Sequence, residues 1–241
     1  MGSTFHMRPS GLAHHTSGSS TSPHALHAHK LVIPLDAPLH LTWPSGRTLT
    51  LDAPALVPAH VTQSMGSDGE TLALFWEVED PLGQVLGANV CRPLHVLEDA
   101  AWWRGLAREV IDAGTDDAVD AILEAPRTRL GWDARGGRRQ DGRITKTQRL
   151  LKESPGGRLP LEVAARAVGL SGSRLSHLFT GETGMTYRRY SLWLRAHDAM
   201  RRLLEGAPIT QAALDSGFSD HAHLTRTMRS LFGQPPSYIT G

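Results

Sequence analysis

One twelve-residue pattern occurs twice in the last third of this 241-residue chain. Residues 160–171 read Pro-Leu-x-x-Ala-Ala-x-x-x-Gly-Leu-Ser, and 48 positions later residues 208–219 read Pro-Ile-x-x-Ala-Ala-x-x-x-Gly-Phe-Ser. The proline suits the first turn of a short helix, because its fixed φ is helical and its missing N–H has no partner there. The second alanine lets another helix cross closely, and the glycine provides a left-handed turn. Each copy therefore predicts a helix-turn-helix.

The helix expected after each turn keeps an apolar stripe at spacings of three and four residues. The two stripes, offset by 49 positions, are Leu175, Leu178, Phe179 and Leu224, Thr227, Met228. One copy alone would also fit an ordinary helical hairpin, whereas two copies favour a duplicated tri-helical unit. Between them, Tyr187 to Leu204 has helical periodicity and predicts a helix of about 25 Å. Such a helix would separate the two units by close to one turn of DNA, about 34 Å.

Charge is unevenly distributed along the chain. Residues 1–130 contain 8 Lys and Arg against 15 Asp and Glu, a net −7, whereas residues 144–241 contain 13 against 7, a net +6. Phosphates attract a basic surface and repel an acidic one, so DNA should bind only the C-terminal part. No apolar run approaches the roughly 20 residues of a membrane span, which argues against a membrane partner. The lone cysteine, Cys91, favours a reducing cytoplasm.

The N-terminal half predicts a small β-structure followed by helices. Residues 1–26 are expected to form a disordered arm, of which 1–7 resemble a tag remnant. Short apolar runs closed by turn residues then indicate a small antiparallel barrel or sandwich. Those runs are 30–34, 39–43, 48–51, 55–58 and 71–78. Amphipathic periodicity predicts helices over 100–113 and 117–124, and the Gly- and Arg-rich segment 131–143 is the expected linker.

The second copy and its following helix closely resemble the C-terminal signature of AraC-type (AraC/XylS) transcriptional regulators. The residues that carry the resemblance are Ala213, Gly217, Phe218, Ser219, Asp220, Leu224, Arg226, Met228, Gly233, Pro236 and Tyr238. Leu224 and Met228 stand where that family often has phenylalanine, which keeps the positions apolar. The resemblance covers about residues 144–241. It implies an α+β two-domain fold, in which a cupin-like effector-sensing and dimerisation domain (27–130) precedes an all-α domain of two helix-turn-helix units joined by a long helix (144–241).

Polar residues on the outer faces of the two second helices are the candidate DNA contacts. They are Ser173, Arg174, Ser176, His177 and Thr180 in the first, and His221, Ala222, Thr225, Arg226 and Arg229 in the second. By resemblance, Ser173, Ser176 and His177 face base edges, while Arg174 suits a phosphate. Arg226 is the first choice for a guanine, because a guanidinium can bind O6 and N7 together. Alternatively, Arg226 pairs with Asp220 or Asp215 and stabilises the fold.

The histidines of the N-terminal half invite comparison with a metal-binding cupin. His27-x-His29 would place two imidazoles on one face of a strand, but the first acid after them is Asp36, and Thr62 stands at a later ligand position, with His60 two residues early. We therefore expect no metal and no cofactor. A small-molecule pocket is the other interpretation, with simple surface or core histidines as the alternative. It would use some of His29, His40, Trp43, His60 and Trp76.

No catalytic motif is evident, since there is neither a Gly-rich phosphate loop after a strand nor a G-x-S-x-G elbow. The sequence thus predicts a cytoplasmic, homodimeric transcription factor rather than an enzyme, with double-stranded DNA, a small-molecule effector and RNA polymerase as candidate partners. The expected dimer surface contains Trp103, Leu106 and Val110. Two alternatives remain: a regulator controlled by a protein partner or by dimerisation alone, and a metal-dependent cupin enzyme with an appended DNA-binding domain.

Overall fold

The structure is a computed structural model that describes residues 3–90, 93–132 and 140–240. These residues form two compact units, one N-terminal and one C-terminal. Most of the expected linker and Cys91 lie outside the described residues. Within those ranges, no helix is both long and apolar enough to cross a membrane.

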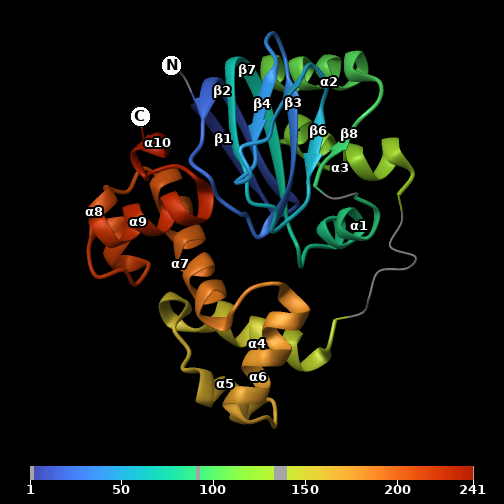
Figure 1. Ribbon diagram of the computed structural model, residues 1–241. Coiled ribbons are helices and arrows are strands. Elements are labelled where there is room, and N and C mark those ends of the chain that lie inside the picture. Colours follow the sequence, from blue (N-terminus) through green and yellow to red (C-terminus); the bar gives the residue numbers. More distant parts are fainter. Residues whose placement is uncertain (1–2, 91–92, 133–139, 241) are drawn as a thin grey trace. The chain divides into compact units, whose positions relative to one another are not determined.

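The N-terminal unit is built on one antiparallel sheet of eight strands (Figure 1). The strands are β1 (Ser3–Arg8), β2 (Gly11–Ser20), β3 (Ala28–Pro34), β4 (Leu39–Thr42), β5 (Thr48–Leu51), β6 (Ala55–Val57), β7 (Ser64–Glu77) and β8 (His95–Val96). The long β7 organises the sheet, because it pairs with β2 along one edge and with β3 and β4 at the two ends of the other. The remaining strands extend it through β1–β2, β3–β6, β6–β8 and β4–β5 pairs.

Alternation along β3 divides the apolar residues between two faces. Leu31 and Ile33 belong to a large core that also contains residues of three helices. Those helices are α1 (Pro81–Asn89), α2 (Ala100–Ala113) and α3 (Asp116–Leu130). Val32 instead belongs to a second, smaller cluster of strand residues on the other face. We call this second cluster the strand-side core; its buried members are Val32, Leu39, Leu41, Val57, Met65 and Ala73. The expected order of a β-structure followed by helices is confirmed.

The expected disordered arm is wrong, because residues 3–8 and 11–20 form β1 and β2. The segment has no hydrophobic period, but its backbone groups are paired along β7 through β2. Its polar side chains are also paired with one another: the Ser3 hydroxyl donates to Thr16 at 3.1 Å and lies 3.2 Å from Nε2 of His14. Strand pairing and side-chain hydrogen bonds therefore order this segment, and Ala13 adds a buried apolar contact with the large core.

The C-terminal unit is entirely helical, as expected. Its elements are α4 (Gly142–Glu153), the 3-10 turn η1 (Pro155–Gly157), α5 (Leu161–Ala167), α6 (Gly172–Thr183), α7 (Tyr187–Leu204), α8 (Ile209–Asp215), α9 (His221–Phe232) and α10 (Ser237–Thr240). The long α7 runs between the α4–α6 group and the α8–α9 group (Figure 1). A helix of this length extends about 27 Å at 1.5 Å per residue. The two tri-helical units thus share α7 as their connection.

The duplicated pattern has the same backbone geometry in both copies. Gly169 and Gly217 have φ of +69° and +79°. The following residues close each turn with matching bonds, because the Leu170 N–H donates to the Ala165 carbonyl at 2.9 Å and the Phe218 N–H to Ala213 at 2.8 Å. A glycine followed by this bond to the carbonyl five residues back is the Schellman ending of a helix. The two predicted helix-turn-helix motifs are therefore α5–α6 and α8–α9.

Candidate nucleic-acid interface

The helix α6 has one buried and one accessible side. Leu175 and Phe179 are fully buried, which fixes the rotation of the helix. The hydroxyl of Ser171 accepts from the Arg174 N–H at 3.3 Å and caps the helix start. All five DNA candidates of this helix retain solvent access. Ser173, Arg174, His177 and Thr180 are exposed, and Ser176 is half-buried.

The helix α9 is arranged in the same way. Leu224 and Met228 are buried, and the Asp220 carboxylate accepts from the His223 N–H at 2.7 Å at the helix start. That backbone bond, together with the Ser219 hydroxyl, lowers the pKa of Asp220, so the carboxylate stays ionised where the helix dipole favours negative charge. The five candidates of α9 are again accessible. His221, Ala222, Arg226 and Arg229 are exposed, and Thr225 is half-buried.

Arg226 has no ion-pair partner among the described residues. Of the two acids considered for it, Asp215 instead binds Arg202 at 3.2 Å. Asp220 bonds with Ser219 and His223, and Arg226 acts on it only through a minor coulombic effect. The guanidinium is exposed on the outer side of α9. An arginine in this state is available to a base edge or a phosphate.

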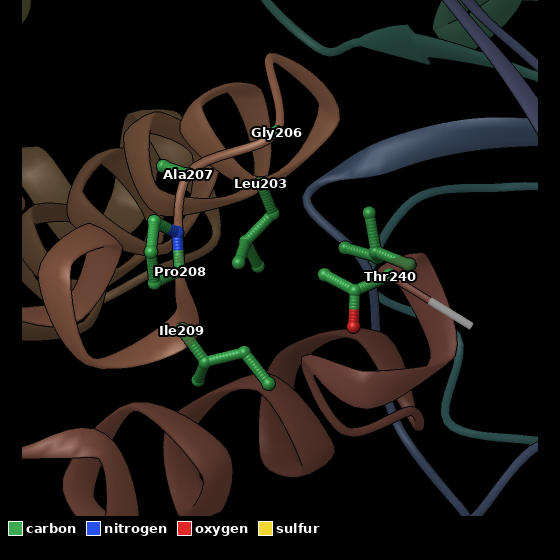
Figure 2. A pocket seen from close by; sticks show the side chains of 7 residues that line it. Leu203, Gly206, Ala207, Pro208, Ile209 and Thr240 are labelled. Carbon is green, nitrogen blue, oxygen red and sulfur yellow. The ribbon is translucent and has the colours of Figure 1, made fainter.

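A pocket of about 460 Å³ lies in the C-terminal unit near the end of α7. Figure 2 shows Leu203 and Ile209 directed toward a space that Thr240 borders from α10. The lining residues are Leu203, Gly206, Ala207, Pro208, Ile209, Ile239 and Thr240. None of the DNA candidates on α6 or α9 is among them, so this pocket is separate from the candidate interface.

The five effector candidates do not come together. His29 and Trp76 are directly opposite each other on β3 and β7, on the sheet face covered by helices, and the Trp76 indole donates to the Leu123 carbonyl at 3.2 Å. His40 is exposed and lies 3.1 Å from the Thr50 hydroxyl. Only Trp43 contacts the strand-side core. The five side chains thus divide between the two faces of the sheet, because side chains alternate along the strands, and a pocket that uses some of them stays a prediction.

The histidines near β3 form hydrogen-bonded contacts. Nε2 of the fully buried His27 lies 2.7 Å from Oε1 of Glu79, and its Nδ1 lies 3.2 Å from Nε2 of His60. The Ala59 N–H donates to Nδ1 of His29 at 3.3 Å. In the part of the chain that the structure describes, no group of three His, Cys, Asp or Glu side chains is placed to hold a metal.

The residues expected to form a dimer surface belong to the domain core. Trp103 is 1% exposed and Val110 is 5% exposed, and both pack in the core beneath the sheet, with Leu106 against them. The sequence pattern showed correctly which side of α2 is apolar, but the sheet of the same domain covers that side. Trp102, by contrast, is 42% exposed and lies beneath the guanidinium of Arg129.

Three basic residues were missed by the sequence reasoning. Lys30 is 2% exposed, and the side-chain amide of Gln63, oriented with its oxygen toward the amine, accepts from Nζ at 2.9 Å. Arg158 and Arg195 both donate to the Gly217 carbonyl in the second helix-turn-helix. The lone lysine at the start of the apolar run 30–34 was a usable signal. The arginines gave none, because their partner is a backbone atom distant in sequence.

Comparison with known proteins places these features in a family. Residues 164–239 match the family model of a helix-turn-helix domain. No curated protein matches the chain.

Three solved structures of ToxT have a similar fold over almost the whole chain. The structure from Vibrio cholerae O395 is 11% identical, covers 94% of this chain and 95% of its own, and has a TM-score of 0.63. The same protein bound to (E)-4-(8-methylnaphthalen-1-yl)but-3-enoic acid is 11% identical, covers 94% of this chain and 96% of its own, and has a TM-score of 0.63. ToxT from Vibrio cholerae strain SCE256 with a bound unsaturated fatty acid is 9% identical, covers 94% of this chain and 93% of its own, and has a TM-score of 0.57. The likeness shows that the two-domain arrangement of a β-rich unit and a helical unit is shared.

The fold and the duplicated motif define a DNA-binding transcriptional regulator. Residues 164–239 therefore form a helix-turn-helix domain of the AraC type.

Proposed function

We propose that this regulator recognises a specific DNA site with α6 and α9. We further propose that its N-terminal unit binds a carboxylic acid with an apolar body, and that this ligand controls DNA binding. The observation that carries the proposal is the pairing of two accessible helix faces, each capped and held by a buried stripe, in one basic unit. Two such helices joined by α7 would enter successive major grooves on one face of the duplex.

The two helices would contribute differently to recognition. In α6, the hydroxyl and imidazole groups of Ser173, Ser176 and His177 would meet base edges, and Arg174 would hold a phosphate. In α9, Arg226 would bind guanine, supported by its exposure and its lack of an ion pair within the described ranges. The second motif would therefore discriminate bases more sharply than the first.

The proposed effector site is the strand-side core. The cross-strand neighbours of Lys30 are Val57 on β6, a member of that core, and Phe75 on β7, which packs against it. The Lys30 side chain therefore extends along an apolar interior, and its ammonium group donates to the Gln63 amide oxygen. Burial lowers the pKa of Lys30 to about 8. The Nε1 atom of Trp43, which contacts the same core, is buried without a hydrogen-bond partner in the described structure. A buried cation and an orphaned donor in an apolar interior suit a carboxylate attached to an apolar body.

The known ligands of the similar fold support this chemistry. The ToxT ligands named above are both carboxylic acids, one of them an unsaturated fatty acid. These are properties of ToxT, and they extend to this chain only as part of the proposal. The proposed site combines Lys30, which was not a candidate from the sequence, with Trp43, which was one of the five.

Thermal melting with a fatty acid and its neutral analogue tests the effector site. Oleate, at 100 times its dissociation constant, should stabilise the full chain by about 2.7 kcal/mol, whereas oleyl alcohol should have a much smaller effect. Lys30→Gln should remove the preference for the acid. Equal shifts with acid and alcohol, or an unchanged preference in Lys30→Gln, would reject the carboxylate site.

Selection from a random duplex library tests DNA reading independently. The full chain should recover duplexes with two short motifs about one helical turn apart. Recovery of no common sequence would contradict specific reading. Homodimer formation, contact with RNA polymerase and the domain limits 27–130 and 144–241 stay predictions, with the first domain now extended to begin at β1.

A further inference from the structure

The turn of the second helix-turn-helix is held by a group of contacts that we call the brace. Its members are Arg158, Arg195, Gly217 and Phe218. Guanidinium groups of both arginines donate to the Gly217 carbonyl, that of Arg195 at 2.8 Å. The Arg195 guanidinium also lies 4.5 Å from the centre of the Phe218 ring. A hydrogen bond from an ionised donor is stronger than a neutral one, so the turn is firmly attached to both arginines.

The two arginines come from different parts of the unit. Arg195 lies in the middle of α7, whereas Arg158 follows η1 and directly precedes the first helix-turn-helix. Its segment is itself attached to α7, because the Ser191 hydroxyl donates to the Gly157 carbonyl at 2.6 Å and the Tyr187 hydroxyl to the Leu159 carbonyl at 2.8 Å. The brace thus connects the entry of the first motif to the turn of the second.

Close backbone approach accompanies these bonds. A Cβ built on Gly156 would lie 3.7 Å from the Cα of Gly217, so two glycines meet where the segments touch. On the other side of the turn, the Ser216 hydroxyl donates to the Asp198 carboxylate of α7 at 2.8 Å. The turn glycine of the first motif lacks such a close approach, since a Cβ on Gly169 would meet nothing within 4 Å. That motif is attached instead through Lys146 of α4, whose Nζ donates to the Ala167 carbonyl at 2.9 Å.

The brace has an electrostatic cost that points to a positioning role. Burial lowers the pKa of Arg195, and the positive charge of Arg158 lowers it further. The Arg195 Nε is also buried without a hydrogen-bond partner in the described ranges. Two like charges on one carbonyl oxygen, with no carboxylate paired to either among the described residues, would be a poor way to gain stability alone. They do fix the direction in which the second motif leaves α7.

We infer that the brace sets the spacing and relative rotation of the two recognition helices, making Arg158 and Arg195 positioning residues for DNA recognition. The inference rests on the proposed reading by both α6 and α9. A straight α7 fixes a length, but the short turns at its ends leave rotation of each motif open. One added base pair rotates the second half-site by about 34° and moves it by about 3.4 Å. With the brace, the second motif cannot rotate and shift to meet the displaced half-site, whereas without the brace it can.

The test compares binding to duplexes in which the spacing between the two selected motifs is varied. For the full-length wild-type chain, one inserted base pair should weaken binding at least tenfold. In Arg158→Ala combined with Arg195→Met, which keeps an apolar contact over Phe218, the penalty should fall to about twofold. Arg149→Ala, an exposed arginine on α4, is the charge control and should keep the wild-type penalty.

The single variant Arg158→Ala is a second test that should fold normally, because Arg158 is exposed. It should also reduce the loss of affinity caused by the inserted base pair. A tenfold penalty retained in both variants overturns the brace. An equal loss of affinity on every spacing also overturns it and assigns the arginines to phosphate contacts. Failure of the wild-type chain to select any sequence would instead reject the proposed function, so the two failures are distinguishable.

Discussion

Gly169 and Gly217 occupy the same place in the two helix-turn-helix motifs, with left-handed φ of +69° and +79°, yet their surroundings differ. A Cβ on Gly217 would lie 3.2 Å from Nε of Arg158, whereas one on Gly169 would meet nothing within 4 Å. The duplication therefore conserves the backbone turn and not the contacts around it. The turn glycine of the second motif is closely surrounded, whereas that of the first is open.

Alanine substitutions at these two positions should separate two contributions to the free energy of unfolding: the strain of a left-handed backbone and the loss of a neighbouring contact. Gly169→Ala should destabilise the chain by about 1 to 2 kcal/mol, because the left-handed region crowds a Cβ. Gly217→Ala should cost a further 1 kcal/mol or so, since Arg158 must move and loses a hydrogen bond. Urea unfolding of the two variants measures the difference. Equal destabilisation would show that the Arg158 contact contributes nothing.

Arg226→Ala should weaken binding to the selected duplex by about 1 to 3 kcal/mol and relax preference at one base position. The physical reason is loss of a bidentate contact to guanine. Titration against selected and scrambled duplexes at fixed salt measures it, with Arg174→Ala as the matched control on α6. The control should weaken both duplexes alike and lower the salt slope by about one. A uniform loss in Arg226→Ala would assign that residue to phosphate.

The helical unit was predictable because its signals are local and repeated. Proline, paired alanines and glycine at fixed spacing determine each turn, and Leu175 and Phe179 show which side is inward. The strands β1 and β2 were missed because their residues are polar and their order depends on pairing with β7, which is distant in sequence.

The five effector candidates divide between the two faces of the sheet for a related reason. Composition selects His and Trp as ligand-binding residues, but strand register decides which face each side chain joins. His40 and Leu41 are neighbours in sequence, yet one is exposed and the other is in the strand-side core. Lys30 was detectable as a lone lysine in an apolar run, but its role could be inferred only once its neighbours on the two adjoining strands were known.

Charging α2 distinguishes core residues from surface residues. Trp103→Glu should destabilise the N-terminal unit by at least about 3 kcal/mol, because it removes a buried ring and buries a carboxylate. Trp102→Glu should cost under about 1 kcal/mol, since that ring is 42% exposed. Circular dichroism melting measures both, and light scattering of Trp102→Glu tests the predicted homodimer on this outward face. A folded, monomeric Trp103→Glu would restore the dimer surface expected from the sequence.

The cost of burying Lys30 should appear as a pH dependence of stability. Its pKa is lowered from 10.5 to about 8 by burial, so between these values the unfolded chain binds the additional proton and stability rises with pH. Lys30→Met removes this titration. The variant's advantage in free energy of unfolding over the wild type should therefore be largest below pH 8 and fall by about 3 kcal/mol by pH 10.5. Urea titrations across this range measure it, with Lys146→Met at an exposed lysine as the control. An advantage that is independent of pH, or that changes equally in the control, would mean that the ammonium group is solvated rather than held in the strand-side core.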